Sequence, residues 1–408
     1  MQIVSPMRLL LIAPCADGND VGEAWSAHQW AQRLSERHDV TVLTYYKRGH
    51  VPPSVQLPKA RVVEWHDLPI VDRAERFNSL LKPGYVAFYA RCRRWIKAAL
   101  RRGEQFDLAH QIIPLALRYP SPAVGFPMPY LLGPVGGGLD DPEGFHGDSD
   151  RAPWYVGLRN IDAWRLRHDP MMRRTYDDAA CVLGIAPYVA DALSSRRVRR
   201  FEVMSDTGIV ELPEPVDRRG RSGPVRLLYV GRIVRTKGLR DAIRALALVP
   251  ASKSVTLDVV GDGFDREPCV ALAAELGVTD RVTFHGRVPR ERVDDFYRSA
   301  DVFVFPSYRE PGGNVVWEAM GYGLPVVVAD RGGPGESVDD ASGFRIHPRT
   351  PDQFAADIAA ALTRLVDEPD LRSQMGAAAR TRVAGLALWD LKIERLEGWY
   401  AEIVAASQ

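Results

Sequence analysis

Two carboxylates flank a pair of glycines in the segment from Glu310 to Glu318, which reads Glu-Pro-Gly-Gly-Asn before a pattern typical of a helix. Glycines leave bare backbone amides free to face a ligand, and the N-terminus of a helix favours a negative group such as phosphate. The two carboxylates could accept hydrogen bonds from the hydroxyls of a sugar or another polyol. The alternative is one capping glutamate and one solvated glutamate.

A second group able to hold an anion lies earlier, where Arg232 and Lys237 follow the apolar run 227–230. Arg232 comes directly after Gly231, and Lys237 precedes Gly238 at the start of a helical pattern. A guanidinium and an ammonium around one turn could converge on a diphosphate. Two solvated surface charges are the alternative.

The elements that must position these residues are short apolar runs, each followed by a loop and a helical pattern, as in βαβ units of a parallel sheet. Ligands bind at the carboxyl ends of the strands in such sheets, and both groups fall there. In the first half the predicted strands include 9–13, 40–44, 130–132 and 181–183, and in the second half they are 227–230, 255–260, 282–284, 302–305 and 326–329. The predicted fold class is therefore α/β.

The length of 408 residues predicts about two domains. We expect one domain at 1–211, a linker at 212–224 that is rich in proline, glycine and arginine, and a second domain at 225–385. The tail 386–408 carries too many apolar residues to be a solvated appendage, so it should dock on a domain.

Composition excludes several classes of protein. A content of 46% hydrophobic and 26% charged residues is that of a globular protein, and a net charge of +1 argues against a nucleic-acid partner. The four cysteines show no disulfide or metal-ligand spacing, which fits a cytoplasmic setting. The first apolar run, 9–13, is shorter than the ~7 to 15 residues of a signal peptide, and no run approaches the ~18 residues of a membrane span. Any membrane contact should be peripheral, on the inner face.

Three motifs occur in the order seen in family 4 glycosyltransferases of the GT-B fold: Gly231-Arg232 with Lys237-Gly238, the Glu310–Glu318 segment, and Gly332-Gly333 with Glu336. The chain resembles this family specifically over roughly 225–344 and more loosely in its first half. The resemblance implies two Rossmann-like domains with a cleft between them and a C-terminal helix that crosses back to the N-terminal domain. It implies an acceptor site in the N-terminal domain and a donor site in the C-terminal domain.

The resemblance also implies a hexosyltransferase-type enzyme that transfers a sugar from a nucleotide-diphosphate-sugar, UDP or GDP, to an acceptor hydroxyl with retention of configuration. Arg232 and Lys237 would hold the diphosphate and stabilise the leaving group, Glu310 would contact the donor sugar, and Glu318 would contact the ribose. The further donor-binding positions are Gly22, Val288, Gly312, Gly313, Asn314 and Val315. A donor phosphate oxygen would help to deprotonate the acceptor, so neither a protein nucleophile nor a cofactor is expected.

Two positions in the first half carry the looser resemblance. Gly22 lies in the loop after the first strand and resembles the family's Gly-Gly loop beside the diphosphate, although Val21 replaces the first glycine. The segment Phe106-Asp107-Leu108-Ala109-His110 resembles the family's Asp-x-x-His-x-His element, but the second histidine position is Ile112. His110 is thus a catalytic candidate, and a buried, hydrogen-bonded histidine is the alternative.

We expect no metal, because the one Asp-x-Asp candidate, Asp148-Ser149-Asp150, lies in a polar loop with no strand leading into it. The segment 91–102 predicts a basic amphipathic helix with Cys92, Trp95, Ile96, Ala99 and Leu100 on one face. Such a helix could lie on anionic lipid and present a lipid-linked acceptor. The alternative is an ordinary helix that packs on the N-terminal sheet and solvates its basic face.

The sequence thus predicts a retaining, metal-independent glycosyltransferase of glycan, polysaccharide, glycolipid or natural-product biosynthesis, acting on a sugar, a lipid-linked sugar or a small molecule. Two alternatives stay open. One is a nucleotide-sugar epimerase of similar fold, and the other is a non-catalytic binding protein that keeps the GT-B fold. A nicotinamide dehydrogenase is disfavoured, because neither half shows Gly-x-Gly-x-x-Gly after its first strand.

Overall fold

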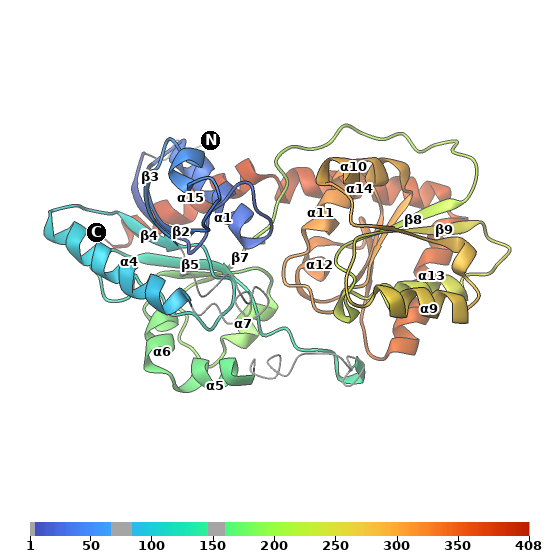
Figure 1. The fold of residues 1–408 in the computed structure, drawn as a ribbon, viewed down its shortest axis with the longest axis horizontal. Coiled ribbons are helices and arrows are strands. Elements are labelled where there is room, and N and C mark those ends of the chain that lie inside the picture. The colour runs from blue at the N-terminus through green and yellow to red at the C-terminus, as the bar shows by residue number, and fades with distance from the viewer. Residues whose placement is uncertain (1–4, 67–83, 146–159, 408) are drawn as a thin grey trace. The chain divides into compact units, whose positions relative to one another are not determined.

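The computed structural model describes residues 5–66, 84–145 and 160–407 (Figure 1). The chain divides into two compact units. Unit 1 comprises Met1–Gly138, Trp154–Asp206 and Trp389–Gln408, and unit 2 comprises Leu139–Pro153 and Thr207–Leu388. Each unit is a parallel sheet with helices on its faces, as the alternation of apolar runs and helical patterns predicts.

Unit 1 contains a seven-stranded parallel sheet in the order β3-β2-β1-β4-β5-β6-β7. Its strands are β1 (Arg8–Ile12), β2 (Asp39–Tyr46), β3 (Arg61–His66), β4 (Leu108–Gln111), β5 (Tyr130–Val135), β6 (Cys181–Gly184) and β7 (Phe201–Val203). Its helices are α1 (Glu23–Ser35), α2 (Pro53–Gln56), α4 (Gly84–Arg101), α5 (Asn160–His168), α6 (Pro170–Asp177), α7 (Tyr188–Ala192) and α15 (Trp389–Ala405).

Both faces of this sheet are buried. Successive side chains of a strand point to opposite faces, so the unbroken apolar run of β1 needs a cover on each side. Leu9 and Leu11 lie in one core with residues of α1 and α15, whereas Leu10 and Ile12 lie in a second core with residues of α4.

The C-terminal tail completes the first of these cores. Trp389 of α15 is fully buried, and its ring meets that of Trp30 in α1 edge-on at 5.1 Å between centroids. Tyr400, farther along α15, is also fully buried. The prediction that the apolar tail docks on the N-terminal domain is therefore confirmed, with the helix beginning at Trp389.

Unit 2 contains a six-stranded parallel sheet in the order β10-β9-β8-β11-β12-β13. Its strands are β8 (Val225–Val230), β9 (Val255–Val260), β10 (Val282–Gly286), β11 (Val302–Phe305), β12 (Val326–Ala329) and β13 (Gly343–Ile346). Its α-helices are α8 (Leu239–Leu248), α9 (Arg266–Glu275), α10 (Arg290–Ser299), α11 (Asn314–Gly321), α12 (Gly332–Ser337), α13 (Pro351–Asp367) and α14 (Pro369–Leu386), with short 3₁₀ turns η2 (Glu143–Phe145), η4 (Arg235–Lys237) and η5 (Thr279–Arg281). Helices α9 and α13 cover one face of the sheet, and α10, α11 and α14 cover the other (Figure 1).

Two stretches of the chain belong to a unit that the predicted domain ranges do not give them. Residues 212–224 belong to unit 2, where the Arg218 guanidinium donates hydrogen bonds to the carbonyls of Tyr297, Ala300 and Tyr322. Residues 139–145 also belong to unit 2, although they precede the last strands of unit 1 in the chain. No helix within the described residues is long and apolar enough to cross a membrane.

Candidate functional site

The loop between β11 and α11 carries Glu310 and the two glycines. Gly313 has a φ of 80°, a left-handed conformation that favours glycine, and it caps the N-terminus of α11. The amide of Val316 bonds back to the Gly313 carbonyl at 2.9 Å. The loop therefore delivers Glu310 to the N-terminus of a helix at the carboxyl edge of the sheet, as the sequence predicts.

A close backbone contact with α12 supports this loop. The amide of Gly333 donates to the Glu310 carbonyl at 3.0 Å. A Cβ on Gly333 would lie 2.0 Å from the Gly312 carbonyl oxygen, and one on Gly332 would lie 2.2 Å from the Glu310 carbonyl oxygen. Only glycine fits at both positions, which explains the Gly332-Gly333 pair in structural terms.

The loop after β8 is held in the same way. A Cβ on Gly238, whose φ is 75°, would lie 2.1 Å from the Pro306 carbonyl oxygen. A Cβ on Gly261 would lie 1.9 Å from the Gly231 carbonyl oxygen. The loop carrying Arg232 and Lys237 is therefore packed backbone to backbone against the loops that follow β9 and β11.

These two loops bring Lys237 and Glu310 together in an ion pair, with side chains only 12% and 15% exposed. Burial lowers the pKa of Lys237 to about 7, and the nearby Arg232 guanidinium adds to the shift. Contact with the Glu310 carboxylate favours the charged ammonium and opposes that shift. Arg232 itself is exposed, and no carboxylate within the described residues pairs with it. Two motifs that were predicted separately thus form one charged site.

Glu318 is fixed by three donors. One carboxylate oxygen accepts from Asn314 Nδ2 at 2.7 Å and Arg290 Nη2 at 2.9 Å, and the other accepts from the Tyr297 hydroxyl at 3.0 Å. The Oδ1 atom of Asn314 is a buried acceptor that has no hydrogen-bond partner in the described part of the chain. Val288 and Val315 are half-buried against the core of unit 2, so only their backbone atoms would suit a polar ligand.

The part of the chain that carries this site is similar in sequence to known proteins. Residues 216–382 match the sequence model of the glycosyl transferases group 1 family. The chain is 38% identical over 174 residues to a D-inositol 3-phosphate glycosyltransferase of Streptomyces griseus, a match covering 40% of this chain and 36% of that protein. It is 34% identical over 174 residues to a glycogen synthase of Mycobacterium tuberculosis, covering 42% and 41%. The matches thus span less than half the length of either relative.

Solved structures match along nearly the whole chain. Sucrose-phosphate synthase from Thermosynechococcus elongatus superposes with a TM-score of 0.68 at 22% identity, covering 98% of this chain and 100% of that one. Anabaena HepE in complex with UDP superposes with a TM-score of 0.63 at 17% identity, covering 98% and 100%. The chain has the GT-B fold. The predicted fold class is confirmed, and the match of 216–382 falls on unit 2, where the motifs are.

In the N-terminal unit of this GT-B chain, Gly22 caps α1 with a φ of 65°, and its carbonyl accepts from the Ser26 amide at 3.0 Å. Nothing lies within 4 Å of a Cβ built at Gly22, and Val21 is 79% exposed. Gly22 therefore lies on an open loop at the carboxyl end of β1. Its contact with a donor stays a prediction.

His110 in β4 is fully buried, and both ring nitrogens are hydrogen-bonded within unit 1. A carbonyl can only accept, so Nε2–H donates to the Gly133 carbonyl and Nδ1 accepts from the Tyr400 hydroxyl. Burial lowers the pKa of His110 to about 4, which keeps the ring neutral. The structure favours the buried, hydrogen-bonded histidine over the catalytic one, because no ring nitrogen is available to a substrate.

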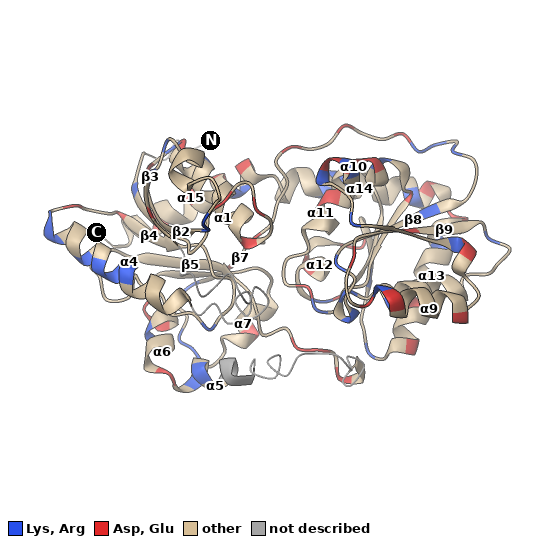
Figure 2. Ribbon diagram, viewed as in Figure 1, with Lys and Arg blue, Asp and Glu red and all other residues tan. Residues whose placement is uncertain are grey.

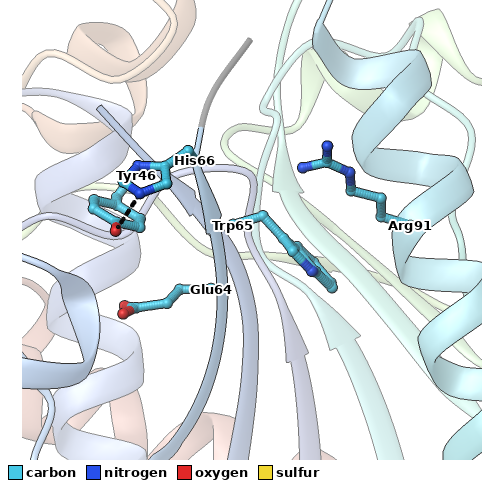
Figure 3. A pocket seen from close by; sticks show the side chains of 5 residues that line it. All are labelled: Tyr46, Glu64, Trp65, His66 and Arg91. Atoms are coloured by element: carbon cyan, nitrogen blue, oxygen red, sulfur yellow. Dashed lines mark hydrogen bonds between the residues drawn. The ribbon is translucent and has the colours of Figure 1, made fainter. Parts of the chain in front are cut away.

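A shallow hollow of about 500 Å³ lies elsewhere in unit 1, at the carboxyl ends of β2 and β3 (Figure 3). It is lined by Tyr46, Glu64, Trp65, His66 and Arg91. The Tyr46 hydroxyl and His66 Nε2 are 2.9 Å apart, and Arg91 extends from α4. Arg91 lies in the predicted basic helix, whereas Tyr46, Glu64, Trp65 and His66 were not identified from the sequence. Their place at the ends of two strands is the signal that could have found them.

The basic helix α4 packs on the sheet of unit 1. Cys92, Ile96 and Ala99 of its apolar face are fully buried, so this face is not available to lipid. Lysine and arginine residues recur along α4 (Figure 2). Of these, Arg94, Lys97 and Arg101 are exposed. The structure favours the alternative, a helix that packs on the N-terminal sheet and solvates its basic face. Contact of this basic face with anionic lipid stays a prediction.

A metal site was not expected, and the Asp148-Ser149-Asp150 motif lies outside the described residues. Within residues 5–66, 84–145 and 160–407, no group of three or more histidine, cysteine, aspartate and glutamate side chains could hold a metal ion.

We expect Gly333→Ala to lower stability by about 1 to 3 kcal/mol and to displace the Glu310 loop, because the added methyl meets the Gly312 carbonyl. Chemical denaturation measures the change. Gly385→Ala in α14 is the matched control, since nothing lies within 4 Å of its Cβ and alanine favours a helix. Equal stability of the two variants would contradict the proposed backbone contact.

The stability of the protein should fall as pH is lowered from about 6.5 to 4, because the unfolded state binds a proton at His110 that the folded state refuses until about pH 4. The contribution of His110 is on the order of 3 kcal/mol when complete. His110→Asn should be less stable at pH 7 but lose less stability on acidification. Denaturation midpoints across this range test it, with exposed His347→Asn as the control. A variant of unchanged stability that has lost transfer activity would instead indicate catalysis.

Proposed function

We propose that this protein is a retaining glycosyltransferase of family 4 that transfers a hexose from a nucleotide-diphosphate-sugar to an acceptor hydroxyl without a metal. The observation that carries the proposal is the meeting of Lys237 with Glu310 at the N-terminus of α11, where glycine amides are available. The glycosyltransferase names among the similar proteins, and the UDP in the HepE complex, support the same donor class.

The donor would bind by exchange of ionic partners. A diphosphate brings negative charge to Lys237 and Arg232, so it can replace the Glu310 carboxylate as the partner of the ammonium. Glu310, released from Lys237, can then accept hydrogen bonds from the sugar hydroxyls. Glu318 is already held by three donors and would accept from the ribose, while amides from Gly312 to Val315 would face the phosphate and the sugar.

Transfer would break the bond between the anomeric carbon and the phosphate oxygen and form one between that carbon and the acceptor oxygen on the same face. The acceptor proton would pass to a phosphate oxygen of the donor, and the nucleoside diphosphate would leave. Lys237 and Arg232 would stabilise the negative charge that develops on the leaving group. In this scheme two cationic side chains take the place of a metal ion.

The acceptor would bind to unit 1, which is where the resemblance expects it. The hollow at the ends of β2 and β3 is a candidate part of that surface, because a tyrosine, a tryptophan, a histidine and an arginine offer both stacking and polar contacts. The class of acceptor is a sugar, a lipid-linked sugar or a small molecule with a free hydroxyl. Polysaccharide, glycolipid or natural-product biosynthesis would use such a reaction.

Incubation of the protein with UDP-, GDP- and ADP-sugars, first by thermal shift and then by product mass, tests the proposal. We expect one donor to raise the melting temperature and to yield a transfer product in the presence of a chelator. Lys237→Ala should lower kcat/KM about 10²- to 10³-fold and Glu310→Gln should also reduce transfer, because each removes a charge from the site. Lys253→Ala, at an ion pair with Asp367, is the control.

Each alternative has its own result in that assay. Loss of activity on chelation that Mn²⁺ or Mg²⁺ restores would refute metal independence. A changed donor sugar with no acceptor consumed would indicate an epimerase, and donor binding without turnover would indicate a binding protein. Undiminished transfer by both site variants would refute the residue assignment.

We further propose a cytoplasmic protein that contacts the inner face of the membrane through the exposed basic side chains of α4. Flotation with liposomes containing anionic lipid should carry the protein upward at low salt and release it at high salt, since the contact is electrostatic. Reversal of Arg94, Lys97 and Arg101 to glutamate should abolish flotation, whereas reversal of Arg298 on unit 2 should not. Equal flotation with neutral and with anionic liposomes would contradict this proposal.

A further inference from the structure

Residues 139–145, which we call the anchor segment, leave the unit in which their neighbours in the chain are folded. Strand β5 ends at Val135, and the amide of Gly136 still bonds to the Leu115 carbonyl of unit 1 at 2.6 Å. From Leu139 to Phe145 the chain packs on unit 2. Helix α5, which follows at Asn160, belongs to unit 1 again.

Phe145 secures the end of the anchor segment and is only 2% exposed. Its ring lies 4.5 Å from that of Tyr308 and 5.9 Å from that of Phe354, between centroids. The Arg235 guanidinium lies 5.5 Å from the Phe145 ring and 5.4 Å from the Tyr308 ring. The side chain therefore fills an aromatic pocket of unit 2 and makes a cation–π contact with a buried arginine.

Three further contacts tie the anchor segment to unit 2. Arg309 Nη1 donates to both carboxylate oxygens of Asp141, at 3.0 and 3.1 Å, with side chains 15% and 23% exposed. A Cβ on Gly332 would lie 2.9 Å from Cδ2 of Leu139. A Cβ on Gly144 would lie 2.1 Å from the Arg349 carbonyl oxygen, so the segment is seated against backbone.

Of these contact residues, Arg235, Tyr308 and Arg309 lie on the two loops that carry the charged site. Arg235 opens the turn η4 that ends at Lys237, and Arg309 directly precedes Glu310. Resting on the donor role given above to Lys237 and Glu310, we propose that Asp141 and Phe145 are positioning residues of the donor site. They act through Arg309 and Arg235, and they hold the two loops at the spacing that a diphosphate-sugar requires.

The charges around Arg235 show why the loop needs Phe145. Arg235 is 4% exposed and is neutralised by an ion pair with Asp241, which is fully buried. Its guanidinium plane is covered by Phe145 and Tyr308. Removal of the Phe145 ring would admit water to this buried pair and loosen η4, and with it Lys237.

The test compares Asp141→Asn with the charge exchange Asp141→Arg/Arg309→Asp. We expect Asp141→Asn to raise the KM for the nucleotide-sugar about tenfold or more while leaving the KM for the acceptor unchanged, because small displacements of positioning groups cost up to about a hundredfold. The double variant Asp141→Arg/Arg309→Asp should bring the KM for the nucleotide-sugar back toward the wild-type value. Asp367→Asn, which removes an ion pair with Lys253 elsewhere in unit 2, is the control.

Hydrogen exchange provides a readout that does not depend on activity. The amides of Lys237, Gly238 and Gly333 are hydrogen-bonded within the two loops. They should exchange faster in Asp141→Asn and in Gly144→Ala, which adds a methyl against the Arg349 carbonyl without removing a contact group. Phe145→Leu should speed hydrogen exchange at these amides less than Phe145→Ala does, since leucine keeps part of the buried volume.

The outcomes separate the two proposals. The role of the anchor segment is overturned if hydrogen exchange at these amides is unchanged in Asp141→Asn and Gly144→Ala. It is also overturned if Asp367→Asn loses as much amide protection as they do. Both outcomes hold whatever the protein binds. Failure of the wild-type protein to bind any UDP-, GDP- or ADP-sugar overturns the proposed function. If hydrogen exchange at these amides is faster in Asp141→Asn and returns toward the wild-type rate in Asp141→Arg/Arg309→Asp, the positioning role is supported.

Discussion

The loops of unit 2 that carry the proposed donor site depend on backbone contacts too close for any side chain to intervene. The loop after β8 touches the loops after β9 and β11 at Gly261 and Gly238, and the loop after β11 touches α12 at Gly333. Contacts of this kind leave little freedom for a loop to relax around a ligand. The charged groups are therefore placed before a ligand arrives, which is the condition under which fixed charges stabilise a transition state most effectively.

The three basic residues of the first loop then take different parts because their surroundings differ. Arg235 is buried and neutralised by Asp241, so its charge stabilises the loop and is not available to a ligand. Lys237 is paired with Glu310, a partner that an incoming anion can replace. Arg232 is exposed at the rim of the loop. A run of similar residues thus supplies one structural cation, one exchangeable cation and one that can meet the ligand first.

The sequence was sufficient for the fold and for the local parts of the site. Continuous apolar runs predict strands buried on both faces, and glycines beside charged residues mark the loops after them. It was insufficient where a contact joins distant residues. Tyr400 hydrogen-bonds His110, and Phe145 fills a pocket beside Arg235, but nothing near either residue in sequence indicates these partners. The edge strand β13 is not among the predicted strands, because its residues run buried, half-buried, exposed and half-buried and so form no continuous apolar run.

The difference between backbone contacts and side-chain contacts accounts for the part of the chain in which the sequence similarity to known proteins is concentrated. The match to the family spans 216–382, which contains every glycine whose Cβ would strike a donor-site loop. A backbone contact admits one residue type, so such a segment retains a recognisable sequence. The hollow of unit 1 is instead lined by side chains that project from strand ends and from α4, and these can change without moving the backbone. A GT-B chain can therefore vary what unit 1 binds while unit 2 keeps one set of loops, and the side chains of unit 1 are the place to test for the proposed acceptor site.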